Sequence, residues 1–124
     1  MPVTDANAMS HSYVEALNAG DLEALTALYE PNVKYITRSG KVLDGQAAIR
    51  DFLERLVAMK GNMQITNDYC VVNGDIALVR GRWSFSATGA DGRPIENRGR
   101  SAEVLHRGAD GHWRYLIDHP FGAD

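Results

Sequence analysis

Four side chains are the candidates for acid–base catalysis in this sequence: Tyr13, Glu103, Asp118 and His119. His119 ends the last segment of alternating apolar residues, and an imidazole that titrates near neutrality would suit a general base. Asp118 could orient His119 only if the strand twists or bulges there, because adjacent residues on a regular strand point to opposite sides. The alternative for His119 is a structural histidine, hydrogen-bonded near the edge of a sheet.

Glu103 lies in a predicted strand over residues 97–107, whose two faces hydropathy does not distinguish. One face carries Arg100 and His106, and the other carries Glu103 and Leu105. The ordinary interpretation of Glu103 is an exposed surface carboxylate. If the opposite face is the inner one, Arg100 enters a pocket with His106 and can hold a carboxylate or an enolate.

Helices are predicted in the N-terminal half of the chain. Apolar residues at spacings of three to five around Tyr13–Leu22 and up to Leu28 predict two short amphipathic helices that face one core. Gly20 tolerates the left-handed backbone that closes a helix, and Asp21 offers a carboxylate to the amides of the next one. A longer amphipathic helix is predicted over residues 46–59, with Gly61 after its end.

Pro31-Asn32 is expected to break the chain after the second helix. A two-residue period then predicts strands over 33–37, 63–72, 76–88, 97–107 and 112–119. Alternation in the last of these places Trp113, Tyr115, Ile117 and His119 on one covered face, with Asp118 opposite. Helices followed by strands, without alternation between them, predict an α+β fold: three N-terminal helices packed in the concave face of a curved, mostly antiparallel sheet. A chain of 124 residues is expected to form a single domain over 1–124.

Composition argues against several classes of function. A net charge of −3 does not suit a nucleic-acid surface, which needs clustered positive charge. The single cysteine, Cys70, fits a reducing, cytoplasmic setting, and neither a secretory leader nor a membrane-spanning run is recognised. The spacing of the histidines predicts no metal site, and no glycine-rich phosphate loop is present, so we expect no cofactor.

The order of these motifs resembles the nuclear transport factor 2-like superfamily over nearly the whole chain. It comprises a helix, an Asn-Ala-Gly-Asp-Leu turn, a second helix, a short strand, Asp-Gly before a long helix, and three long strands with a final Asp-Gly-x-Trp. Within that superfamily the chain is most similar to the ketosteroid isomerase-like and SnoaL-like groups. Tyr13–Leu22 resembles the first-helix motif of bacterial ketosteroid isomerase, and Gly45–Phe52 resembles its third helix. The resemblance implies a cone-shaped fold with an apolar pocket, a small hydrophobic ligand and a homodimer formed by the outer face of the sheet.

The resemblance also implies roles for particular residues. Tyr13 matches the tyrosine that donates a hydrogen bond to the developing enolate oxygen, whereas the position of the general-base aspartate falls on Thr37. The position of the protonated aspartic acid falls near Ala102 or Glu103. A pocket wall is expected from aromatic and polar residues, which also include ordinary core residues: Tyr35, Thr37, Phe52, Trp83, Phe85, Arg100, Trp113 and Tyr115.

Three functions stay open at this point. The first is a cofactor-free acid–base enzyme for an apolar carbonyl compound, with Tyr13 as donor and His119 or a strand carboxylate as base. The second is a non-catalytic binding or dimerisation module of the same fold. The third is a hydrolase or dehydratase, which needs a buried Asp/His or Asp/Arg pair.

Overall fold

The computed structural model describes residues 2–124, and its helices occupy the parts of the chain where the sequence predicts them. A short 3-10 turn, η1 (Ala6–Ala8), precedes α1 (Met9–Asn18), and Gly20 after it has a φ of 71°. Asp21 accepts a hydrogen bond from the Ala24 amide at 3.0 Å and so caps α2 (Leu22–Thr26). The third helix, α3, spans Gln46–Ala58.

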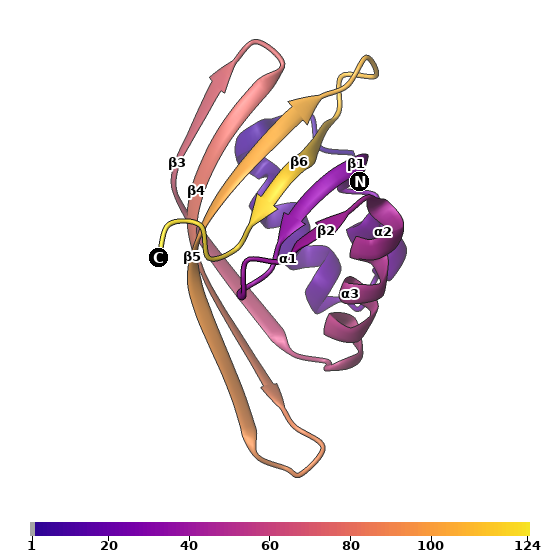
Figure 1. The fold of residues 1–124 in the computed structure, drawn as a ribbon, viewed down its shortest axis with the longest axis vertical. Helices are drawn as coiled ribbons and strands as arrows, with labels where there is room; N and C mark the ends of the chain where they lie inside the picture. Colours follow the sequence, from indigo (N-terminus) through magenta and orange to yellow (C-terminus); the bar gives the residue numbers. More distant parts are fainter. Residues whose placement is uncertain (1) are drawn as a thin grey trace.

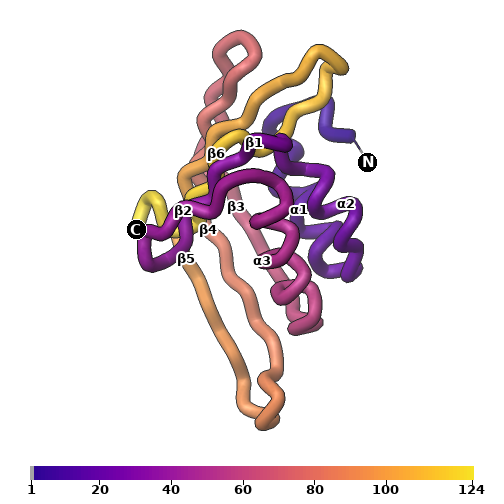
Figure 2. Tube along the Cα trace, turned by 45° about the vertical axis from the view of Figure 1, so that its right-hand side comes forward, coloured from indigo at the N-terminus to yellow at the C-terminus, as the bar shows by residue number. Residues whose placement is uncertain are grey.

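The strands form a single six-stranded sheet in the order β2-β1-β6-β5-β4-β3. Their bounds are β1 Tyr29–Ile36, β2 Val42–Asp44, β3 Asn62–Asn73, β4 Ile76–Thr88, β5 Pro94–Arg107 and β6 Trp113–His119. Every neighbouring pair is antiparallel except β1 with β6, which is parallel. Figure 1 shows the helices on one face of the curved sheet, and Figure 2 shows the β4–β5 hairpin extending beyond them. The predicted α+β architecture is confirmed.

The core lies between the helices and the concave face of the sheet. Leu25, Ile49 and Leu53 contribute fully buried side chains from the helices, and Leu105 contributes one from β5. Full burial of such a side chain stabilises the fold by about 1.5–3 kcal/mol. The face of β4 expected to be covered is indeed buried at Ala77, Val79, Gly81 and Phe85, and half-buried at Trp83.

The first strand is longer than its sequence predicts. β1 starts at Tyr29 rather than at Val33 and continues through Pro31, which was expected to break the chain. Its pairing with β6 shifts register between Tyr29 and Lys34, so the proline sits in an irregular stretch of the ladder. This extension brings Tyr29, fully buried, beside the last strand.

An extra residue in β6 changes which side chains enter the core. Val104 pairs with Ile117 while Leu105 pairs with Tyr115, so Leu116 forms a β-bulge. Trp113 and Tyr115 are buried as predicted, but after the bulge the alternation is inverted. Ile117 is exposed and Asp118 is buried. The predicted common inner face of Trp113, Tyr115, Ile117 and His119 is therefore wrong beyond Tyr115.

The outer face of the sheet carries an apolar row. Register pairs place Val71, Leu78, Val104 and Ile117 directly beside one another across β3, β4, β5 and β6. Val71, Leu78 and Ile117 are exposed. The homodimer expected on this face stays a prediction. None of the helices that residues 2–124 form has the length and apolar character that a membrane-spanning helix needs.

Candidate active site

A cavity of about 440 Å³ opens between the helices and the concave face of the sheet. Its volume is in the range of pockets that bind small organic molecules. Aromatic and aliphatic side chains from α1, α3, β3 and β4 make most of the wall: Tyr13, Phe52, Leu56, Met63, Ile65, Trp83 and Phe85. The cavity can therefore accept an apolar body.

Two carboxyl groups lie side by side in the otherwise apolar wall. Glu103 on β5 and Asp118 on β6 are register partners in the antiparallel pair, and both line the cavity. Partners of this kind present side chains to the same face, with Cβ atoms roughly 4.5–5.5 Å apart. The bulge at Leu116 is the local cause, because it turns Asp118 toward the face that Glu103 occupies.

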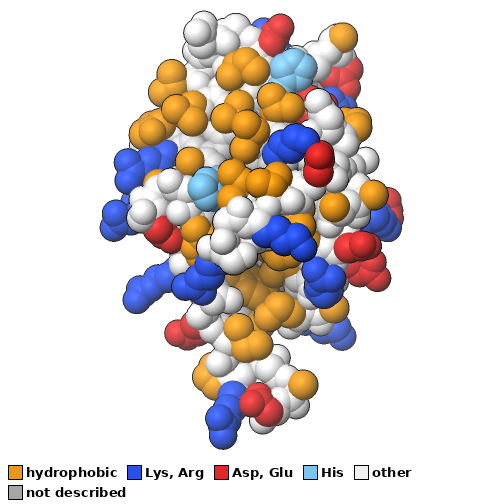
Figure 3. All heavy atoms as spheres, in the orientation of Figure 1, with side chains coloured by type: hydrophobic (Ala, Val, Ile, Leu, Met, Phe, Trp, Pro, Cys, Tyr) orange, Lys and Arg blue, Asp and Glu red, His pale blue; other side chains and the backbone are white. Residues whose placement is uncertain are grey.

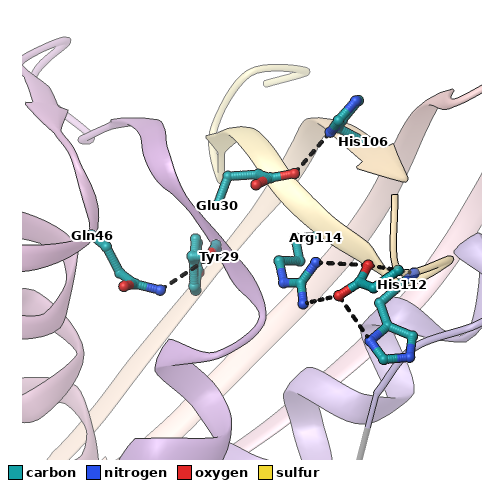
Figure 4. A network of polar contacts seen from close by, with 7 residues as sticks. Tyr29, Glu30, Gln46, His106, His112 and Arg114 are labelled. Atoms are coloured by element: carbon teal, nitrogen blue, oxygen red, sulfur yellow. Dashed lines mark hydrogen bonds and ion pairs between the residues drawn. The ribbon is translucent and has the colours of Figure 1, made fainter. Parts of the chain in front are cut away.

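Each carboxyl group has its own hydrogen-bond donor. The Tyr29 hydroxyl donates to Asp118 Oδ2 at 2.8 Å, and the Ser101 hydroxyl donates to Glu103 Oε1 at 2.8 Å. Gln46 in turn fixes the backbone of Tyr29, because its side-chain amide donates to the Tyr29 carbonyl at 3.0 Å (Figure 4). The two acids are thus held by donors from different elements.

Burial and mutual repulsion make these acids hard to ionise. Burial and the neighbouring charge of Asp118 raise the pKa of Glu103 to about 8, although the Ser101 hydrogen bond acts in the opposite direction. Burial also raises the pKa of Asp118 to about 6, against the lowering effect of the Tyr29 hydrogen bond. Two acids coupled in this way titrate as a pair, so they share a proton near neutral pH. One can then accept a proton while the other donates one.

Tyrosines surround the acid pair. Tyr13 meets Tyr115 edge to face at a centroid distance of 6.2 Å, and Tyr115 packs on Tyr29 at 4.9 Å. Burial raises the pKa of Tyr13 and of Tyr35 well above its usual value. Both phenols line the cavity and keep their protons, so they are available as hydrogen-bond donors.

The C-terminal segment forms part of the cavity rim. Trp83 Nε1 donates to the Pro120 carbonyl at 2.7 Å, and the Trp83 ring meets Phe121 at a centroid distance of 5.3 Å. Gly99 pairs with Trp83 across β4 and β5, and a Cβ there would lie 2.9 Å from Trp83 Nε1. The absence of a side chain at Gly99 therefore leaves room for the indole and for the segment that it binds.

Most of the site residues predicted from the sequence line this cavity. They are Tyr13, Tyr35, Thr37, Phe52, Trp83, Phe85, Glu103, Tyr115 and Asp118. Glu103 is not the exposed carboxylate of the ordinary interpretation, because the Ser101–Leu105 side of β5 is the inner one. Thr37, at the position where the resemblance implies a carboxylate base, lies in the wall.

Three predicted residues lie outside the cavity. His119 points away from Asp118 and packs against Gly122, so the adjacent pair forms no dyad. Arg100 is exposed because it shares the outer face of β5 with His106. Trp113 is buried near the other end of β6, where its amide donates to the Val3 carbonyl and Arg107 covers its ring. These placements correct the expectation that all three contribute to the site.

Sequence reasoning missed Tyr29, Ser101 and Arg38. Ser101 could have been found from its spacing of two from Glu103, which places both side chains on one face of a strand. Tyr29 gives no local signal, because its contact with Asp118 spans 89 residues. Within residues 2–124, no group of three or more His, Cys, Asp and Glu side chains is arranged to hold a metal ion.

Solved structures show how widely this fold is shared. A ketosteroid isomerase-like protein from Erwinia carotovora atroseptica superposes with a TM-score of 0.80 at 19% identity, covering 92% of this chain and 90% of that one. A proposed dehydratase of the NTF2-like family from Streptomyces avermitilis gives 0.77 at 21% identity, covering 94% and 92%. A proposed calcium/calmodulin-dependent protein kinase II association domain from Xanthomonas campestris gives 0.75 at 20% identity, covering 95% and 86%. The fold is therefore that of the nuclear transport factor 2-like superfamily.

A sequence family model also identifies the family of this chain within that superfamily. The sequence model of the SnoaL-like domain matches residues 11–116, and the chain belongs to this family. Comparison with curated proteins gives no match. The names of the three structural neighbours come from different functional classes, so the chemistry has to be argued from the cavity of this chain.

Proposed function

We propose that this protein is a cofactor-free acid–base catalyst that transfers a proton on a small apolar carbonyl compound. The observation that carries the proposal is the Glu103–Asp118 pair in the wall of an apolar cavity. Burying carboxyl groups costs free energy, and an apolar binding pocket alone does not need them. Shifted titration of paired acids in a cavity is typical of catalytic sites.

In the proposed reaction, the Asp118 carboxylate removes a proton from the carbon next to the carbonyl group. The electron pair of the broken C–H bond moves into the new carbon–carbon double bond, and the carbonyl oxygen becomes an enolate. Protonated Glu103 and the Tyr13 hydroxyl donate hydrogen bonds to that oxygen. For this the substrate carries a carbon–carbon double bond in the β,γ position, so that the enolate is a conjugated dienolate. Returning the proton from Asp118 to the γ carbon then completes an isomerisation, and no redox partner is needed.

Dehydration is the second candidate. Glu103 is held protonated near neutral pH and could transfer its proton to a leaving hydroxyl group after Asp118 has removed the carbon-bound proton. The name of the Streptomyces avermitilis neighbour points to the same reaction class. We favour isomerisation because Asp118 returns the proton that it removed, so the acid pair ends each turnover in its starting protonation state, whereas dehydration moves the proton of Glu103 to the leaving group. The third option, a pure binding module, accounts for the cavity but not for its acids.

Steroid isomerisation by the familiar arrangement is not the proposed reaction. Thr37 occupies the position of the base and cannot remove a carbon-bound proton near neutral pH. Asp118 would act from β6, whereas Thr37 lies directly after β1, so the base would act from a different part of the wall. We therefore expect little or no turnover of Δ5-3-ketosteroids.

The elimination of 5-nitrobenzisoxazole tests for the proposed base. In this reaction a base removes a ring C–H proton, the N–O bond breaks, and a coloured phenolate is released, so no natural substrate has to be known. The wild-type protein should catalyse this elimination faster than acetate ion does as a carboxylate base in solution. Asp118→Asn should lower the rate of the protein by about 100-fold or more. Asp51→Asn on the exposed side of α3 is the matched control and should leave the rate unchanged. Equal rates for wild type and Asp118→Asn, with both folded by circular dichroism, would overturn the proposal.

A further inference from the structure

Arg38 is a cation at the cavity rim. It lies in the turn between β1 and β2, lines the cavity and is exposed to solvent. Its guanidinium carbon lies 5.0 Å from the centroid of the Phe121 ring, so the side chain is held over the cavity rim instead of extending into solvent.

No carboxylate neutralises this cation. Six other Lys and Arg side chains form ion pairs with Asp or Glu: Lys34, Arg50, Arg82, Arg93, Arg107 and Arg114. Within residues 2–124, no acidic group lies within ion-pair distance of Arg38. Its N–H groups are therefore available to a ligand.

Other basic side chains lie near a hydrophobic hollow in the surface. Figure 3 shows hydrophobic side chains in a hollow below the middle of the molecule, with Lys and Arg side chains on both sides of it. Thr37, Ser39 and Asn97 add polar groups to the cavity lining near Arg38 and on β5. The interior has the opposite character, because Glu103 and Asp118 together are negative once the pair has lost its first proton.

We propose that the ligand of this cavity is amphipathic, with an apolar body and an anionic oxygen group, such as a carboxylate, that binds Arg38 at the rim. A planar guanidinium matches the two oxygens of a carboxylate and can bind them in parallel. The acid pair repels an anion, so the apolar or carbonyl-bearing end enters first. This inference rests on the proposed function only for that orientation, and its test involves no proton transfer.

Two fluorescent probes of similar shape test the inference by titration. 8-Anilinonaphthalene-1-sulfonate is anionic, and N-phenyl-1-naphthylamine is its neutral counterpart. Arg38→Gln should weaken binding of the anionic probe by about fivefold or more and change binding of the neutral probe by less than about twofold. Arg38→Lys keeps the positive charge, and its affinity for the anionic probe should fall by about threefold or less. Arg98→Gln, an equal loss of charge on the exposed outer face of β5, is the matched control and should leave both affinities unchanged.

The outcomes separate this inference from the proposed function. Equal weakening of both probes by Arg38→Gln, an equal effect of Arg98→Gln, or wild type that binds neither probe would each overturn the anion site. A protein that discriminates the probes through Arg38 but does not accelerate the elimination reaction would keep the anion site and lose the catalytic proposal.

Discussion

Glu103 and Asp118 face each other across β5 and β6 inside an apolar cavity, and each accepts a hydrogen bond from a different hydroxyl group. The two donors are unequal in position. Ser101 is two residues from Glu103 on the same strand, whereas Tyr29 reaches Asp118 from β1. The two acids therefore have different hydrogen-bonding environments.

Removing the hydrogen-bond donor of Asp118 should raise the pKa of the Asp118 carboxyl group, so that this group ionises at a higher pH and is a stronger base. Tyr29→Phe deletes the hydrogen bond that lowers the pKa of Asp118, so the rising limb of the elimination rate should move up by about one pH unit. A pH–rate profile measures this directly. Tyr69→Phe, on the exposed part of β3, serves as the control. A profile for Tyr29→Phe that coincides with that of wild type would contradict the assignment of Asp118 as base.

The phenol of Tyr13 should matter in the transition state more than in binding. Tyr13→Phe keeps the edge-to-face packing on Tyr115 but removes a donor to the developing oxyanion. We expect kcat for the elimination to fall by roughly 10- to 100-fold with little change in KM. Steady-state kinetics separate the two effects. A rise in KM with kcat unchanged would assign Tyr13 to binding alone.

The acid pair should destabilise the fold as pH rises. In the unfolded chain both carboxyls lose their protons near pH 4, whereas in the folded protein they keep them up to about pH 6 and 8. Between these pH values the folded state binds more protons than the unfolded state. The contribution of the acid pair to the free energy of unfolding is therefore complete below pH 4 and is lost as pH rises to about 8. Urea unfolding should give a lower stability at pH 8 than at pH 5, by about 5 kcal/mol from this pair.

Glu103→Gln isolates this contribution, because it removes one titrating group and the repulsion on Asp118. The loss of stability between pH 6 and 8 should become smaller in this variant, whereas Glu54→Gln on the exposed side of α3 should behave as wild type. An unchanged pH dependence in Glu103→Gln would contradict the raised pKa of Glu103.

The homodimer can be tested at the apolar row on the outer face. Leu78 lies between Val71 and Val104 in the register, and a charge there would be desolvated in a dimer. Light scattering should give a dimer for wild type and a monomer for Leu78→Glu. Ser84→Glu, farther along the exposed side of β4, should remain a dimer. A monomeric wild type, or dimeric Leu78→Glu, would show that this row is not the interface.

Local signals explain how much of the fold was predictable. The caps at Gly20 and Asp21, the period of α3 and the alternation of β4 all depend on neighbours within a few residues, and the structure agrees with each. The resemblance added the curved sheet and its cavity. β1 was predicted too short because Pro31 usually interrupts pairing, but here it lies in an irregular part of a longer strand.

The site was less predictable because its geometry depends on one bulge and one long-range contact. Leu116 carries no feature that marks it as an inserted residue, so alternation placed His119 inward and Asp118 outward, the reverse of the observed arrangement. The contact between Tyr29 and Asp118 exists only after β1 and β6 pair. The sequence did not predict which face of β5 is the inner one, because Glu103 is a polar residue in a covered position.

The central claim, that Glu103 and Asp118 share a proton near neutral pH, is tested most directly by following both side-chain carboxyl carbons by NMR during a pH titration. Labelled protein, with Glu103→Gln and Asp118→Asn used for assignment, should show the two signals moving together in two steps, near pH 6 and near pH 8. In each variant the remaining acid should titrate in a single step at a lower pH than the upper step of the pair. Independent titration of both carboxyls below pH 5 in wild type would contradict the account.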